Sequence, residues 1–92
     1  EKKGKREMKQ FEHTITDELG IHAWPAGLLV KKAGEFASTV TIDNGQKKAD
    51  AKKLISLMML AVKKGQTVKF IIEGADEDKA AAVLEAFMKE NL

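Results

Sequence analysis

The sequence predicts an α+β domain, an open-faced β-sandwich in which a four-stranded antiparallel sheet carries three helices on one face. Four short segments alternate apolar or β-branched residues with polar ones, as half-buried strands do. Three other segments repeat apolar residues at the spacing of a helix with one buried face. Turn residues separate these segments in the order β-α-β-β-α-β-α, and three helices on one face would bury every apolar stripe in two layers.

The first half of the chain begins with a strand at 10–16, where apolar and polar side chains alternate. A loop then leads to His22, and the first helix follows it and ends at Gly34, a glycine suited to the C′ position. The buried face of this helix is expected at Ala26, Leu29, Val30 and Ala33.

The middle of the chain predicts a hairpin and a short helix. β-Branched residues favour a strand at 36–43, and the pair Asn44-Gly45 is a strong hairpin signal that returns the chain over 46–50. The helix that follows is expected to bury Leu54, Leu57, Met58 and Ala61.

The last strand is expected at 67–72, and Gly74 marks its exit. Asp76 is a good N-cap for the last helix, where Glu77 and Asp78 complement the helix dipole. The buried face of that helix is expected at Ala80, Val83, Leu84 and Phe87.

The length and composition predict one small domain at 8–92. Residues 1–7 differ from the rest, and we expect a disordered leader or an expression-derived extension there. This segment holds four basic and two acidic residues and accounts for the whole net charge of +2, so the basic balance is poor evidence for nucleic-acid binding. The lack of cysteine suits a reducing compartment. No apolar run approaches the roughly 20 residues that span a bilayer, so membrane insertion is not expected.

The most informative segment is Gly-Ile-His-Ala-Trp-Pro-Ala-Gly at 20–27, which places His22 immediately before a helix. Ala23 and Trp24 keep their backbone N–H groups, while the proline after them has none. These N–H groups and the positive end of the helix dipole would face an anion attached to the imidazole. The alternative interpretation is that His22 is an ordinary turn residue. A metal site is not expected, because His13 lies in a different element without ligand spacing.

The order Gly-Ile-His-Ala-x-Pro-Ala before an amphipathic helix resembles the active-site signature of the HPr family, the phosphocarriers of the bacterial phosphoenolpyruvate:sugar phosphotransferase system. The resemblance runs from about Met8 to Leu92. It includes four further segments, namely Asn44-Gly45, the apolar helix Leu54–Leu60, Lys64-Gly65 before a strand, and Glu73–Asp76 before the last helix. The resemblance implies the HPr-like open-faced sandwich, the same fold that the periodicity predicts.

The resemblance also implies a function. His22 would accept a phosphoryl group from enzyme I and pass it to sugar-specific IIA domains, and the backbone N–H groups of Ala23 and Trp24 would bind that group. Such a protein is a stoichiometric phosphohistidine carrier, not an enzyme that turns over a small molecule. We expect a cytoplasmic monomer that needs no cofactor or metal.

A docking surface is implied on the short helix beside His22. This helix is more apolar than one buried face requires, and exposed apolar clusters mark partner surfaces. Ile55 and Met58 are the principal partner-binding candidates, with Leu54, Leu60 and Trp24 as further ones. The competing interpretation is that the helix residues are ordinary core, in which methionine fills gaps.

Two positions depart from the family pattern. Most HPr proteins have arginine where this chain has Trp24, and an arginine would neutralise phosphoryl charge with directional donors. Lys53 stands where many HPr proteins have a regulatory serine, and lysine cannot be phosphorylated in that way. Lys52 and Lys53 would favour partners with acidic surfaces. The alternative interpretation is that both lysines are simply exposed to solvent.

Two rival functions follow from these features. The first is an HPr-like regulatory or transfer-impaired variant that binds partners without efficient phosphoryl transfer. Acid-labile phosphorylation at His22 would separate it from a carrier. The second is a small nucleic-acid-binding domain, against which stand the single arginine and the few aromatic residues.

Overall fold

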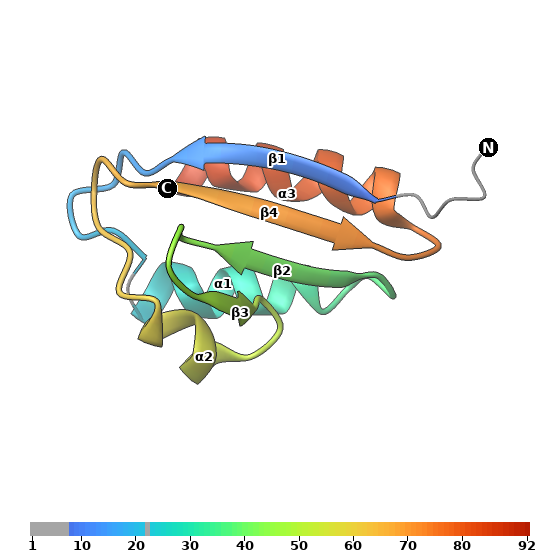
Figure 1. Ribbon diagram of the computed structural model, residues 1–92, viewed down its shortest axis with the longest axis horizontal. Coiled ribbons are helices and arrows are strands. Elements are labelled where there is room, and N and C mark those ends of the chain that lie inside the picture. Colours follow the sequence, from blue (N-terminus) through green and yellow to red (C-terminus); the bar gives the residue numbers. More distant parts are fainter. Residues whose placement is uncertain (1–7, 22) are drawn as a thin grey trace.

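The seven elements occur in the predicted order. A computed structural model describes residues 8–21 and 23–92, and for Ala23 and Trp24 it describes the backbone alone. The elements are β1 (Lys9–Thr14), α1 (Ala23–Ala33), β2 (Thr39–Asp43), β3 (Lys48–Asp50), α2 (Leu54–Met59), β4 (Thr67–Glu73) and α3 (Glu77–Asn91) (Figure 1). The leader expected at 1–7 lies outside the described residues.

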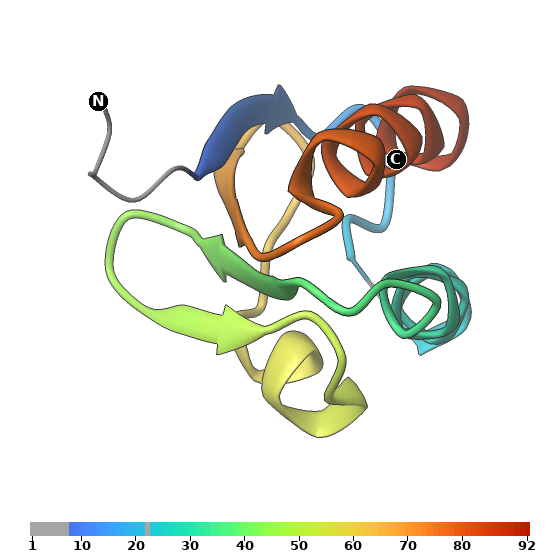
Figure 2. The ribbon, with the colours of Figure 1, turned by 90° about the vertical axis from the view of Figure 1, so that its right-hand side faces the viewer.

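The four strands form one antiparallel sheet in the order β1-β4-β2-β3. Phe70 of β4 is opposite Phe11 of β1 on one side and Ile42 of β2 on the other. Figure 2 shows the helices on one side of this sheet, with the other side left open. The predicted α+β open-faced sandwich is therefore confirmed.

The core lies between the sheet and the helices. From α1 it takes the predicted Ala26, Leu29 and Ala33, and Val30 packs partly buried against it. From α3 it takes Ala80 and Leu84 as predicted, together with Met88, while Val83 and Phe87 are partly buried. The rings of Phe11 and Phe70 stack with centroids 4.6 Å apart.

Some boundaries differ from those predicted. β1 ends at Thr14, because the next residue, Ile15, bonds to the 63–66 turn and not to β4. The N–H of Ile15 donates to the carbonyl of Gln66 (2.9 Å). β2 starts only at Thr39. Gly34 follows α1 as predicted, but it does not adopt a left-handed conformation. Its N–H bonds to the carbonyl of Val30 (2.9 Å), which continues the helical pattern by one residue.

The prediction for the buried face of α2 is wrong for three of four residues. Of the six residues in this helix only Leu57 is buried, whereas Leu54 and Met58 are exposed. Ala61 lies beyond the helix and is also exposed. Leu60 and Val62, which follow the helix, fill the core beside Leu57. The chain turns at Ala61, so the residues on either side of it face inward.

Candidate functional site

His22 itself lies outside the described residues, so the site is described through its neighbours. α1 begins at Ala23, immediately after His22, and has no acidic residue in its first turn. Pro25 is buried in that first turn, where its missing N–H costs no helical hydrogen bond. On the other side, Ile21 is buried in the core. The positions before and after His22 are therefore held by the fold.

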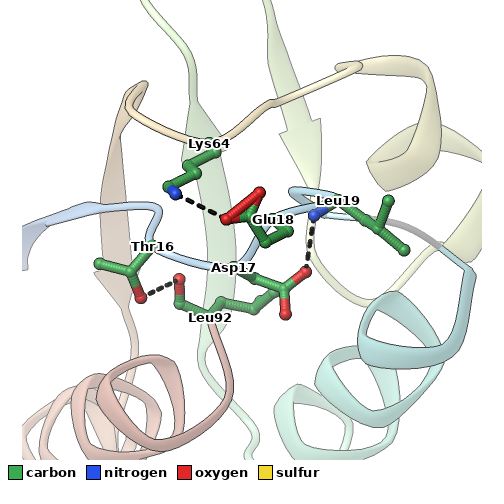
Figure 3. A network of polar contacts seen from close by, with 6 residues as sticks. All are labelled: Thr16, Asp17, Glu18, Leu19, Lys64 and Leu92. Carbon is green, nitrogen blue, oxygen red and sulfur yellow. Dashed lines mark hydrogen bonds and ion pairs between the residues drawn. The ribbon is translucent and has the colours of Figure 1, made fainter.

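The loop before His22 is tied to the end of the chain. The carbonyl of Leu92 accepts hydrogen bonds from the N–H groups of Thr16 and Asp17 and, at 3.1 Å, from the Thr16 hydroxyl. Figure 3 shows the hydrogen bond from the Thr16 hydroxyl together with two other contacts of the loop. The N–H of Leu19 donates to the Asp17 carboxylate (3.1 Å), and Glu18 forms an ion pair with Lys64 (2.8 Å). Loop 15–21 is thus fixed by polar contacts over most of its length.

Gly20 allows this loop to pack closely against the turn that precedes β4. Its φ is +73°, and a Cβ atom built there would lie 2.2 Å from the carbonyl oxygen of Val62. The same carbonyl accepts a hydrogen bond from the N–H of Ile21 (3.0 Å). Glycine is needed at this position for both its backbone conformation and its lack of a side chain.

Exposed apolar side chains gather on α2. Ile55 and Met59 are 69% and 67% exposed, and Leu54 and Met58 are 39% and 38% exposed. We call these four residues the α2 patch. Leu60, which was predicted on the docking surface, is only 6% exposed and contributes to the core instead. Met59, the fourth member of the α2 patch, was not among the predicted contacts.

The two lysines before α2 differ in their contacts. Lys53 is the N-cap residue of α2, is exposed, and makes no side-chain capping hydrogen bond. The ammonium group of Lys52 instead donates to the carbonyl of Phe36 at 2.8 Å and is partly buried. Of the two, Lys53 is therefore the one available beside the α2 patch.

Asp76 is the N-cap residue of α3, as predicted, but its side chain makes no capping hydrogen bond. Its carboxylate accepts hydrogen bonds from the N–H groups of Ala37 and Ser38, both at 2.9 Å, and from the Ser38 hydroxyl. The Ser38 hydroxyl and the Ala37 N–H lower the pKa of Asp76 below its ordinary value of 3.8. At the start of α3, Glu77 accepts a hydrogen bond from the N–H of Gly74 (3.0 Å). Asp76 thus fastens the loop between α1 and β2 to the start of α3.

The described residues contain no group of three or more His, Cys, Asp or Glu side chains that could hold a metal ion. His13 lies in β1 opposite Val68, and within the described part of the chain its Nε2 is buried without a hydrogen-bond partner. No helix in that part is long and apolar enough to cross a membrane. A shallow cavity of about 190 Å³ lies beside the α2 patch and is lined by Lys47, Lys48, Ser56, Met59 and Leu60.

Two features near the site could not be predicted from the sequence. Ala61 has φ +53°, the one positive φ among the described residues that are not glycine. The side-chain amide of Asn44 donates to the carbonyl of Leu60 (3.1 Å), which links the hairpin turn to the end of α2. The Asn44-Gly45 pair signalled the turn, but no local pattern signalled its contact with Leu60.

Comparison with known proteins identifies close relatives. The family model described as "PTS HPr component phosphorylation site" matches residues 9–90. The phosphocarrier protein HPr of Lysinibacillus sphaericus is 41% identical over 83 residues, which is 90% of this chain and 94% of the relative. The HPr-like protein Crh of Halalkalibacterium halodurans is 41% identical over 82 residues, covering 89% and 95%. The solved structure of a Mycoplasma histidine-containing phosphocarrier protein is 33% identical, with a TM-score of 0.86 over 89% of this chain and 93% of the other.

Proposed function

The chain belongs to the HPr family of phosphocarrier proteins, and from this premise we propose that His22 accepts a phosphoryl group from enzyme I and delivers it to sugar-specific IIA domains. The observation that carries the proposal is the start of α1 at Ala23, directly after His22, with no acidic residue in the first turn. The first N–H groups of a helix have no partner within it, and the helix dipole is positive at that end. A phosphoryl group on His22 would be stabilised there.

The chemistry is an exchange of one phosphorus–nitrogen bond for another. An unprotonated ring nitrogen of His22 attacks the phosphorus of the phosphohistidine on enzyme I. The bond between phosphorus and the enzyme I histidine breaks, and its electron pair returns to that imidazole. The same exchange then passes the group from His22 to the histidine of a IIA domain. The backbone N–H groups of Ala23 and Trp24 contribute by holding the phosphoryl oxygens.

Partner docking is assigned to the α2 patch and Trp24. An apolar surface of adaptable side chains, half of them methionine, suits a carrier that must bind both a donor and several acceptors. Lys53 at the N-cap of α2 adds positive charge that favours acidic partner surfaces. Leu60 is left out of this surface because it is buried.

A second function is favoured by Trp24. The usual arginine at this position would pair with phosphoryl oxygens through charged donors, whereas the indole has a single neutral N–H. The chain would then be a transfer-impaired HPr-like protein that binds partners through the α2 patch. One relative at 41% identity is named HPr-like protein Crh rather than phosphocarrier.

Intact-mass measurement after incubation with enzyme I and phosphoenolpyruvate tests the carrier function. We expect the chain to gain one phosphoryl group, which acid treatment removes. The His22→Ala variant should gain none, whereas His13→Gln, which alters the other histidine, should still be labelled. Labelling of His22→Ala, or no labelling of the unaltered chain at high enzyme I concentration, would contradict the carrier function. If the unaltered chain is not labelled but still binds enzyme I, the regulatory function would be favoured.

A further inference from the structure

The turn Leu60–Val62 lies between the α2 patch and the loop that leads to His22, and both of its outer carbonyl groups are bonded. The carbonyl of Leu60 accepts a hydrogen bond from the side-chain amide of Asn44 (3.1 Å). The carbonyl of Val62 accepts one from the N–H of Ile21 (3.0 Å), the residue directly before His22. Since α2 ends at Met59, this turn is the shortest covalent route from the α2 patch to that hydrogen bond.

Ala61, in the middle of the turn, has a backbone conformation that an alanine adopts only when its surroundings enforce it. Its φ of +53° lies in the left-handed region, where the Cβ atom crowds the following carbonyl. Leu60 and Val62 are both buried, so their side chains hold the two ends of the turn. The hydrogen bonds of Asn44 and Ile21 hold the two carbonyl groups. The turn is therefore held at both of its ends.

The orientation of the Asn44 amide is set by the hairpin. Its oxygen accepts hydrogen bonds from the N–H groups of Gln46 (2.9 Å) and Lys47 (2.8 Å), a role that only the oxygen can fill. The amide nitrogen must then point the other way, toward Leu60. One side chain thus uses its acceptor to shape the turn between β2 and β3 and its donor to hold the end of α2.

We propose that Asn44 is a positioning residue for phosphoryl transfer, which holds the Leu60–Val62 turn so that the Val62 carbonyl fixes Ile21, the residue before His22, relative to the α2 patch. The proposal rests on the proposed function of His22. A partner seated on the α2 patch must present its histidine to a ring nitrogen of His22, and small errors in such a geometry are costly in rate. Asn44 would reduce those errors without touching the phosphoryl group.

The variant Asn44→Asp tests this link. It keeps an oxygen for the N–H groups of Gln46 and Lys47, and it replaces the donor to Leu60 with a carboxylate oxygen. In amide hydrogen exchange on the folded protein, we expect the N–H of Ile21 to exchange about fivefold faster relative to amides of the central strand β4, the effect of losing one hydrogen bond. Thr39→Val is the control, because Thr39 donates a side-chain hydrogen bond to the carbonyl of Glu73 (3.2 Å) away from this turn.

Phosphoryl transfer supplies the second measurement. The side chains of the α2 patch are unchanged in Asn44→Asp, so the concentration of enzyme I that gives half the maximal rate should change little. The maximal rate should fall several-fold, and Thr39→Val should leave it unaltered. Unchanged exchange at Ile21, or an equal effect of Thr39→Val, would refute the link. Faster exchange with an unaltered maximal rate would refute the positioning role. If the unaltered chain accepts no phosphoryl group, the proposed function fails, and the exchange measurement still decides whether Asn44 holds Ile21.

Discussion

Substitutions at Ile55 and Leu57 separate docking from folding within a single helix. Ile55 is 69% exposed and Leu57 is fully buried, although they are two residues apart. Substitutions of exposed residues usually change the free energy of unfolding by less than about 0.5 kcal/mol, and we expect a change of this size for Ile55→Glu. Leu57→Ala removes a buried side chain, which typically costs about 2–5 kcal/mol. For a domain of this size about 1 kcal/mol shifts the Tm by roughly 4–8 °C. We therefore expect a Tm loss of about 4 °C or less for Ile55→Glu and at least about 8 °C for Leu57→Ala.

The two variants should have opposite effects on phosphoryl transfer. Ile55→Glu places a charge on one of the two most exposed residues of the α2 patch and should raise the apparent KM for enzyme I by roughly tenfold, as expected for a residue that contributes strongly to an interface. Leu57→Ala, measured well below its Tm, should transfer with a near-normal KM because its side chain does not reach the surface. Ala86→Glu on the exposed side of α3 controls for the added charge. The docking role would be refuted if Ile55→Glu lost as much stability as Leu57→Ala, or if its KM matched that of Ala86→Glu.

Three further outcomes are expected. Ala61→Gly should raise the free energy of unfolding by about 1 kcal/mol, because glycine adopts φ +53° without strain, and a lower Tm would contradict the strain assigned to Ala61. The pKa of Asp76 is lowered in the folded protein by Ser38 and Ala37, so its contribution to stability is complete above pH 3.8 and is lost as the pH falls through the lower folded value. Acid unfolding followed by circular dichroism should therefore show a weaker pH dependence below 3.8 in Asp76→Asn, and equal curves would count against the contact with Ser38. Trp24→Arg should speed phosphoryl transfer about tenfold or more, since a charge-assisted hydrogen bond contributes roughly 1.5–3 kcal/mol, and equal rates would show that position 24 is not used.

The two long helices were predictable because their signals are local and repeated. The buried faces of α1 and α3 recur over three turns or more, so the apolar spacing determines which side faces the sheet. In the same way, the Asn44-Gly45 pair predicted the turn between β2 and β3, where the Asn44 side chain accepts hydrogen bonds from the N–H groups of Gln46 and Lys47 and Gly45 has φ +96°. The His-x-x-Pro order placed His22 before a helix for an equally local reason, and α1 does begin at the next residue.

The short helix was less predictable, because six residues make fewer than two turns and cannot set the phase of an apolar stripe. Leu54, Met58 and Leu60 are all apolar, so the sequence gives no reason to expect that only Leu60 is buried. That choice depends on where the chain turns at Ala61, and the turn depends on contacts with Asn44 and Ile21. Exposure on α2 was thus decided by packing.

The sequence by itself determined the order of the elements, the fold class and the place of His22 ahead of α1, because each depends on residues close together in the chain. Only the tertiary structure decided which partners the polar side chains take. Asp76 was a sound N-cap candidate by position, yet its carboxylate bonds to Ser38, 38 residues away. The left-handed Ala61 is equally invisible in the sequence, since alanine avoids that conformation unless distant contacts enforce it. Such contacts between segments far apart in the chain, rather than local preference, hold the segment before His22 in place.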